Sequence, residues 1–154
     1  MEIWRKNCNC SQRKKGLRDH FIWVGDQTEK YENVIFLEDD LLVSPEIINF
    51  VEASIEFYKN DNEIAGICLY NPILCEFNGT KFYQTQDGYD VYFLQHPYWG
   101  NIWMKEKWKD FKNWLKTYEL NNSIIPKAVS SWKESSFKKI YIQYLIETNK
   151  YFVV

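Results

Sequence analysis

Short apolar runs and an amphipathic stripe predict the order of the first elements. Residues 34–37 (VIFL) form a continuous apolar run with two β-branched side chains, which is typical of a strand buried on both faces of a sheet. Residues 64–70 (IAGICLY) predict a second buried strand. Between these runs, residues 45–60 carry their apolar side chains on one stripe, as an amphipathic helix does. Strand, helix and strand in this order predict a parallel crossover and therefore an α/β fold.

The proposed helix between these strands has a marked beginning. Ser44-Pro45-Glu46 places a serine at the expected N-cap, a proline at the first helical position and an acid in the first turn. Upstream, residues 17–31 fit a helix loosely, and Gly25 interrupts the pattern. Both segments are therefore expected to be helical, the first with less regularity.

The second half of the chain predicts more helices and strands. Residues 80–95 favour short strands around the Asp87-Gly88 turn. Two amphipathic helices are expected at about 104–118 and 131–148. The final residues, 151–154 (YFVV), are typical of the opening of another strand, and a buried strand that stops at the last residue favours a truncated domain.

Length, charge and hydropathy exclude several classes of protein. Residues 1–15 are polar and basic and predict a charged, poorly ordered lead-in, and residues 16–154 predict one domain or part of one. A formal net charge of −2 argues against a protein that mainly binds nucleic acid. The chain has no run of about 18 apolar residues and no signal peptide, so no membrane span is expected. We expect a cytoplasmic protein, at most docked on a membrane surface.

Aromatic residues and cysteines leave two questions open. Phe, Trp and Tyr make up 18% of the chain. Such rings fill cores, and they also stack on sugars in binding clefts; their helical spacing favours the core for most of them. The cysteines, Cys8, Cys10, Cys68 and Cys75, do not have the spacing of a zinc site and are expected to be reduced thiols.

Three consecutive acids, Glu38, Asp39 and Asp40, follow the first apolar run directly. In open α/β sheets, ligands bind beyond the carboxyl ends of the strands, where this triplet is expected to lie. Neighbouring carboxylates repel one another, and hard oxygen ligands suit Mg²⁺ or Mn²⁺. The residues alone leave two interpretations of almost equal weight, a metal site and a solvated turn.

The segment around the acids resembles a known family. Residues 34–45 (VIFLEDDLLVSP), continued by residues 64–72 (IAGICLYNP), are similar to the N-acetylglucosaminyltransferase I group and its bacterial sugar-transferase relatives. The resemblance spans about residues 16–154 and is sharp only over 33–72. It implies a GT-A-like fold, with a mixed, mainly parallel sheet and flanking helices, here incomplete.

The resemblance implies separate roles for the three acids. In the family, this segment is a variant of the DxD metal motif. Asp40 would bind Mn²⁺ (or Mg²⁺), Asp39 would face the ribose or sugar of a nucleotide donor, and Glu38 would support the donor sugar.

The family also has a loop on the acceptor side, and residues 98–103 (YWGNIW) are similar to it. Trp99, Gly100 and Trp103 would accordingly contact the acceptor. On the residues alone, the rings of Trp99 and Trp103 are equally consistent with stacking on a sugar and with packing in the core. His96, in the preceding loop, is expected to be structural or solvated more often than to touch an acceptor.

The chain departs from the family in two places. Only residues 1–33 precede the acidic strand, whereas the family has early parallel strands there that bind the uridine. Inverting transfer also needs a carboxylate that deprotonates the acceptor hydroxyl. The expected segment, residues 130–134, is SSWKE, with serine in place of the acid. Glu134 is the nearest substitute, and a first-turn helix acid is the alternative interpretation.

Three functions are therefore considered. The first is metal-dependent, inverting transfer of a sugar from a nucleotide-diphosphate sugar, with a UDP-sugar preferred, to a hydroxyl of a glycan or a lipid-linked oligosaccharide. The second is a truncated, non-catalytic remnant of such an enzyme that keeps a metal or sugar site. The third is a metal-dependent phosphoryl-transfer or hydrolase domain, although Glu38-Asp39-Asp40 lacks the Asp-x-Asp spacing of the aspartate-nucleophile phosphatases.

Overall fold

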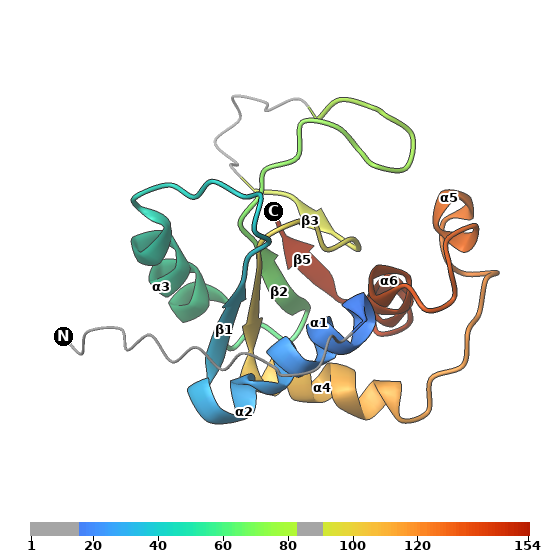
Figure 1. Cartoon of the computed structure of the whole chain (residues 1–154), viewed down its shortest axis with the longest axis horizontal. Helices are drawn as coiled ribbons and strands as arrows, with labels where there is room; N and C mark the ends of the chain where they lie inside the picture. Colours follow the sequence, from blue (N-terminus) through green and yellow to red (C-terminus); the bar gives the residue numbers. More distant parts are fainter. Residues whose placement is uncertain (1–15, 83–90) are drawn as a thin grey trace.

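One mixed sheet with helices on both faces organises the molecule (Figure 1). The computed structural model describes residues 16–82 and 91–154, and the structural statements below concern these residues. The strands are β1 (Asn33–Phe36), β2 (Ile64–Cys68), β3 (Phe93–Leu94), β4 (Asn101–Met104) and β5 (Tyr151–Val153). The helices are α1 (Leu17–Asp26), α2 (Thr28–Tyr31), α3 (Ile47–Tyr58), α4 (Lys105–Leu115), α5 (Lys127–Ser130) and α6 (Phe137–Glu147).

The sheet has the strand order β1-β4-β2-β5-β3. β4 is antiparallel to both of its neighbours, β1 and β2; β5 is parallel to β2, and β3 is antiparallel to β5. The prediction of a mixed sheet is confirmed. The prediction that it is mainly parallel is wrong, because only the β2–β5 pair is parallel. β1 and β2 do run in the same direction, as the strand-helix-strand order predicts, but β4 lies between them.

The sequence predicts a loop at residues 98–103, which include β4, and a strand buried on both faces at β1. The residues of β4 (NIWM) are too few to show a strand pattern, yet all of them are buried. In β1, Phe36 is buried, Val34 and Ile35 are half-buried and Asn33 is exposed. β1 is the first strand in the sheet order and so an edge strand, and the short apolar run could not distinguish an edge strand from a central one.

The predicted beginning of α3 is wrong by a few residues. Glu46 occupies the N-cap position, and Ser44 lies in the turn before it, where its Oγ accepts a hydrogen bond of 3.2 Å from the backbone N–H of Glu46. The helix itself is present, and its Val51, Ile55 and Tyr58 face the sheet as the predicted stripe requires.

The remaining elements are confirmed with shifted boundaries. The loose helix at 17–31 is α1 followed by α2, and α1 ends directly after Gly25. The helices predicted at 104–118 and 131–148 correspond to α4 and α6. The strand predicted at the end of the chain is β5. Asp87-Gly88 and the segment 1–15, with Cys8 and Cys10, lie outside the described residues. Within the described residues, Cys68 and Cys75 are free thiols.

Two apolar cores lie on opposite faces of the sheet. On one face, α1, α4 and α6 pack over Phe36, Trp103 and Phe152, and aromatic rings dominate this core, as expected for most of them. On the other face, α3 covers Ile64, Ile67 and Ile102. No helix in the described segments is long and apolar enough to cross a membrane.

Candidate active site

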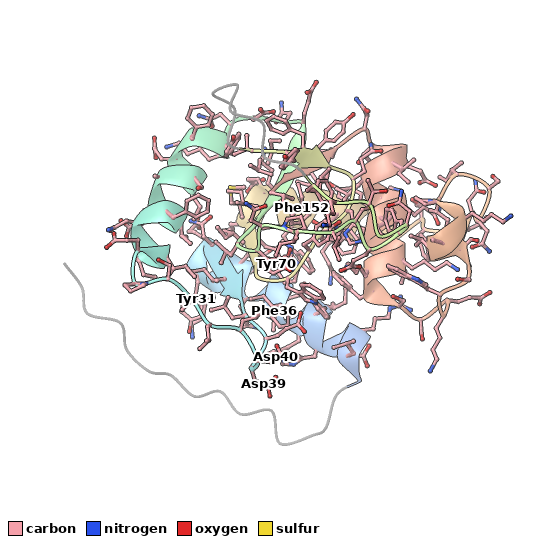
Figure 2. The ribbon with its side chains drawn as sticks, turned by 90° about the horizontal axis from the view of Figure 1, so that it is seen from above. Tyr31, Phe36, Asp39, Asp40, Tyr70 and Phe152 are labelled. Carbon is pink, nitrogen blue, oxygen red and sulfur yellow. The ribbon has the colours of Figure 1, made fainter. Side chains whose placement is uncertain are left out.

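The acidic triplet begins one residue after β1, at the end of the apolar run that the sequence predicts as a strand. Asp39 and Asp40 are exposed, whereas Glu38 is half-buried. The backbone N–H of Leu41 donates a 3.3 Å hydrogen bond to the carbonyl of Glu38 and closes a turn around the two aspartates. Figure 2 shows Asp39 and Asp40 on this loop, at the margin of the molecule. Both aspartates are therefore open to a ligand from solvent.

The three carboxylates are close enough to affect one another. Burial raises the pKa of Glu38, and the charges of Asp40 and Asp39 add to this rise, whereas Lys138 opposes it. A cation at Asp40 would relieve this repulsion. Within residues 16–82 and 91–154, no group of three His, Cys, Asp or Glu side chains forms a ready metal site. Magnesium and manganese need no such group, because they commonly take one or two carboxylates and complete their shell with substrate phosphates.

A charged cluster that the sequence analysis missed lies beside Glu38. Lys138, from α6, donates hydrogen bonds of 2.9 and 2.8 Å to the two carboxylate oxygens of Glu76, which lies in the segment after β2. The Lys138 ammonium also lies 5.5 Å from the ring centre of Tyr98 and 5.6 Å from that of Trp99. We call Glu38, Glu76, His96, Tyr98 and Lys138 the Lys138 cluster. No local pattern marks Glu76 or Lys138, because 62 residues separate them in the chain.

His96 is buried in this cluster, with 4% of its surface exposed. Its ring packs 4.4 Å from that of Tyr98 and 4.6 Å from that of Phe77, measured between centroids. Nε2 lies 3.3 Å from a carboxylate oxygen of Glu76, but neither ring nitrogen makes a well-aligned hydrogen bond within the described part of the chain. Burial lowers the pKa of His96 and outweighs the opposing effect of Glu76, so the imidazole is neutral at pH 7.

The carboxylate of Glu76 stays ionised over a wide pH range. Burial raises its pKa, but the interactions with His96 and Lys138 outweigh burial and lower the pKa to about 2. Because the contact with His96 is poorly aligned, we attribute most of the lowering to the bidentate ion pair with Lys138.

The two tryptophans of residues 98–103 have different environments. The ring of Trp103 is 1% exposed and packs against Phe36 and Trp108, so it belongs to the core. Trp99 is 39% exposed and meets Tyr70 edge-on at 5.0 Å. Gly100 has a φ of +66°, a left-handed conformation that favours glycine, and it turns the chain into β4. Of the two rings, Trp99 is the one that a ligand from solvent can reach.

Glu134 lies between α5 and α6 and is exposed. α6 begins only at Phe137, with Ser136 as its N-cap, so Glu134 is not in the first turn of the helix. Its charge acts on Tyr118, whose pKa is raised by burial first and by Glu134 to a smaller degree. No contact found among the described residues joins Glu134 to the acidic triplet. The hydroxyls of Ser130 and Ser131 donate hydrogen bonds to carbonyls of Lys127 and Ala128.

A cavity of about 460 Å³ opens at the carboxyl ends of the strands, on the face of the sheet that α3 covers. It lies at the carboxyl ends of β1, β2 and β5, and we call it the apolar cavity. Its lining is mostly apolar and includes Leu37, Leu41, Val43, Phe50, Leu69, Tyr70, Trp99 and Val154. The polar side chains in its lining are Ser44, Glu46 and Asn71. The Lys138 cluster and the apolar cavity thus both lie near the carboxyl ends of the strands, and Trp99 is next to both.

Comparison with known proteins agrees with the sequence resemblance. The chain is 25% identical, over 146 residues, to an alpha-1,3-mannosyl-glycoprotein 2-beta-N-acetylglucosaminyltransferase of Arabidopsis thaliana. The match covers 82% of this chain and 32% of the plant protein, so the chain spans about a third of that relative's length. No protein-family model matches the chain, and no solved structure matches it significantly. The likeness supports a relationship to a glycosyltransferase.

Proposed function

We propose that the chain is part of a GT-A-type glycosyltransferase that transfers a sugar, with inversion and with the help of a metal ion. The donor would be a nucleotide-diphosphate sugar, with a UDP-sugar preferred, and the acceptor a hydroxyl of a glycan or lipid-linked oligosaccharide. The observation that carries the proposal is the exposed Asp39-Asp40 pair at the carboxyl end of β1, in a chain similar to a glycosyltransferase.

Each of the three acids would have its own role in donor binding. Asp40 would hold Mn²⁺ or Mg²⁺, Asp39 would hydrogen-bond the ribose or sugar hydroxyls, and Glu38 would support the donor sugar from its half-buried position. When bound, the metal ion would neutralise negative charge on the diphosphate leaving group. Trp99, which is 39% exposed, would contact the acceptor, and Gly100 shapes the turn that follows it.

The acceptor hydroxyl needs a carboxylate that takes its proton. Glu134 has an exposed carboxylate and is our proposed base. Glu76 lies in the Lys138 cluster beside Glu38, but its carboxylate is paired with Lys138 and its pKa of about 2 makes it a weak proton acceptor. We therefore expect Glu134→Gln to lower turnover at least a hundredfold without loss of donor binding, whereas Glu76→Gln lowers turnover less.

A non-catalytic remnant is the second candidate. It is favoured by Ser130 and Ser131, whose hydroxyls bond the carbonyls of α5 where the family would have an acid. This candidate keeps a metal or sugar site but lacks the nucleotide-binding half, so it predicts no thermal shift with any nucleotide sugar and no transfer to any acceptor. A phosphoryl-transfer or hydrolase domain, the third candidate, predicts phosphate release from simple phosphate esters without sugar transfer.

A thermal-shift experiment tests donor binding. Saturating Mn²⁺ with a UDP-sugar should raise Tm by about 5–10 °C, because a ligand at a hundred times its Kd adds about 2.7 kcal/mol to stability. Asp40→Asn should abolish the shift. Asp19→Asn, which changes an exposed acid on α1, is the matched control and should keep it. A shift that survives in Asp40→Asn, or no shift with any nucleotide sugar, would contradict the proposed site.

A further inference from the structure

The apolar cavity is a concave feature of the described structure whose role the proposed donor and acceptor contacts do not explain. Its volume of about 460 Å³ lies in the range of small-molecule sites. It lies at the carboxyl ends of three strands that run in the same direction, the edge where ligands of such sheets bind. Its position is therefore that of a binding site.

The chemistry of the lining indicates what the cavity accepts. A sugar brings a hydroxyl on almost every carbon, and each buried hydroxyl needs a hydrogen-bond partner. The polar side chains in the lining are few, and two of them are engaged: Ser44 accepts a hydrogen bond from the Glu46 backbone, and the Glu46 carboxylate accepts a 2.6 Å hydrogen bond from Asn49. The cavity is suited to hydrocarbon and poorly suited to a sugar ring.

The mouth of the cavity is open to solvent and apolar. Leu42 is fully exposed, and Val43 and Phe50 are about half exposed. Apolar side chains gathered around an opening favour an apolar ligand that enters from solvent, because their exposure is otherwise unfavourable.

Trp99 connects this cavity to the proposed reaction site. Its ring contributes to the cavity lining, and the same ring lies 5.6 Å from the ammonium of Lys138, whose charge acts on Glu38. A molecule with its chain in the cavity would thus have its polar end near the acidic triplet. This arrangement matches an amphiphile with one sugar-bearing end.

We propose that the apolar cavity binds the hydrocarbon part of a lipid-linked acceptor, whose sugar hydroxyl then lies at the acidic triplet. This inference rests on the proposed glycosyltransferase function and selects, from its two acceptor classes, the lipid-linked one. The cavity determines acceptor specificity through chain length, and Phe50 is the side chain that contributes a large apolar surface at its mouth.

Calorimetric titration with alkyl glucosides below their micellar concentrations tests the inference. Methyl β-glucoside should bind weakly, and affinity should rise two- to fourfold per added methylene from hexyl to decyl glucoside, because each buried methylene contributes about 0.8 kcal/mol. Phe50→Gln should weaken octyl glucoside binding at least fivefold. Phe57→Gln is the matched control: it removes an exposed phenylalanine from the same helix, outside the cavity, and should leave binding unchanged.

A second variant tests the cavity independently, in case Phe50→Gln fails to fold. Leu42→Asn changes a fully exposed side chain in the cavity lining, so it leaves the fold intact and should weaken octyl glucoside binding two- to threefold. Equal affinities for methyl and octyl glucoside, or equal losses in Phe50→Gln and Phe57→Gln, would overturn the proposal. A dimer that dissociates on the Phe50→Gln change would also overturn it, because the mouth would then belong to an interface with a second copy.

Donor binding, measured on the same variants, separates this inference from the proposed function. Phe50→Gln should lose alkyl glucoside binding and keep the thermal shift with Mn²⁺ and a UDP-sugar, and Asp40→Asn should show the reverse. Alkyl-chain binding in a protein that shows no donor shift would refute the assignment of the ligand as an acceptor. A donor shift without alkyl-chain binding would refute the cavity assignment alone.

Discussion

The two faces of the sheet differ in how completely they are covered. On one face α1, α4 and α6 enclose an aromatic core, and α6 is buried along most of its length, from Phe137 to Leu145. On the other face α3 has only Val51 and Ser54 fully buried, and its Phe50 and Phe57 face solvent. Figure 1 shows α3 standing alone on its side of the sheet.

This difference indicates that the aromatic face contributes most to stability and that the α3 face is available for binding. The aromatic face is closed by packing, and a closed face has little room for a ligand. The α3 face leaves the apolar cavity at the carboxyl edge of the sheet. We therefore expect substitutions on the first face to change stability, and substitutions around the cavity to change binding.

The largest expected effect is the loss of a buried ring from the aromatic face. Phe111 is 0% exposed and packs against Trp108, Tyr141 and Tyr144. Phe111→Ala should lower the free energy of unfolding by about 3–5 kcal/mol, because it removes buried apolar surface and leaves a cavity. Urea denaturation followed by circular dichroism measures the change.

Phe50→Ala is the matched substitution on the α3 face. Because about half of this ring is exposed, the free energy of unfolding should fall by less than about 1.5 kcal/mol. Losses of similar size in the two variants would mean that the α3 face is as closely packed as the aromatic face, and the division between the faces would fail.

A smaller effect is expected at Gly25, where α1 meets α4. A Cβ at this position would collide with the indole of Trp108, and that indole is held by a 2.9 Å hydrogen bond from its Nε1 to Asp26. Alanine in a helix normally gains up to about 1 kcal/mol over glycine. Here Gly25→Ala should instead destabilise the protein by about 1–2 kcal/mol, because the core is overpacked.

The Tm of Gly25→Ala, compared with that of the wild type, shows whether the substitution stabilises or destabilises the protein. Gly16→Ala is the control, because a Cβ there meets no atom within 4 Å. If Gly25→Ala raised Tm, α1 and α4 would not be in close contact, and the closed packing of this face would be in doubt.

The smallest expected effect concerns the ion pair between Glu76 and Lys138. The folded-state pKa of Glu76 is about 2, below its ordinary value of 4.5. The pair therefore contributes its full stability above pH 4.5, and the contribution is lost as the pH falls from 4.5 towards 2. Glu76→Gln should cost about 1 kcal/mol at pH 7.

Tm measured from pH 3 to pH 7 for both proteins gives the test. The difference between wild type and Glu76→Gln should be constant above pH 5 and should shrink below pH 4.5. A difference that grew on acidification would show that Glu76 is not held as a stabilising carboxylate.

Local pattern predicted several elements well and others poorly. The strand at 64–68 is fully buried and the helices α4 and α6 lie close to their predicted positions, because each carries its own apolar period. β4 was missed because its four residues are too short to show a pattern. The N-cap of α3 was placed at Ser44, although Ser44 lies in the preceding turn and Glu46 is the N-cap.

The candidate site was predicted only in part. The position of Glu38, Asp39 and Asp40 at the carboxyl end of a strand follows from the apolar run before them, and the structure agrees. The metal, donor and base roles of these acids and of Glu134 stay predictions. The Lys138 cluster and the apolar cavity were not predicted, because neither has a signal within any one segment of the chain.

The sequence by itself determined most of the helical and extended segments, and it determined that an acidic triplet follows the first strand. These features depend on the order of side chains within a few neighbouring residues. Only the tertiary structure decided that β4 lies between β1 and β2 and that β1 is an edge strand. It also brought Lys138 close to Glu76 and Glu38. It left Trp99 partly exposed to solvent, whereas Trp103 is buried in the core. Such features depend on contacts between segments far apart in the chain, and a local pattern does not record these contacts.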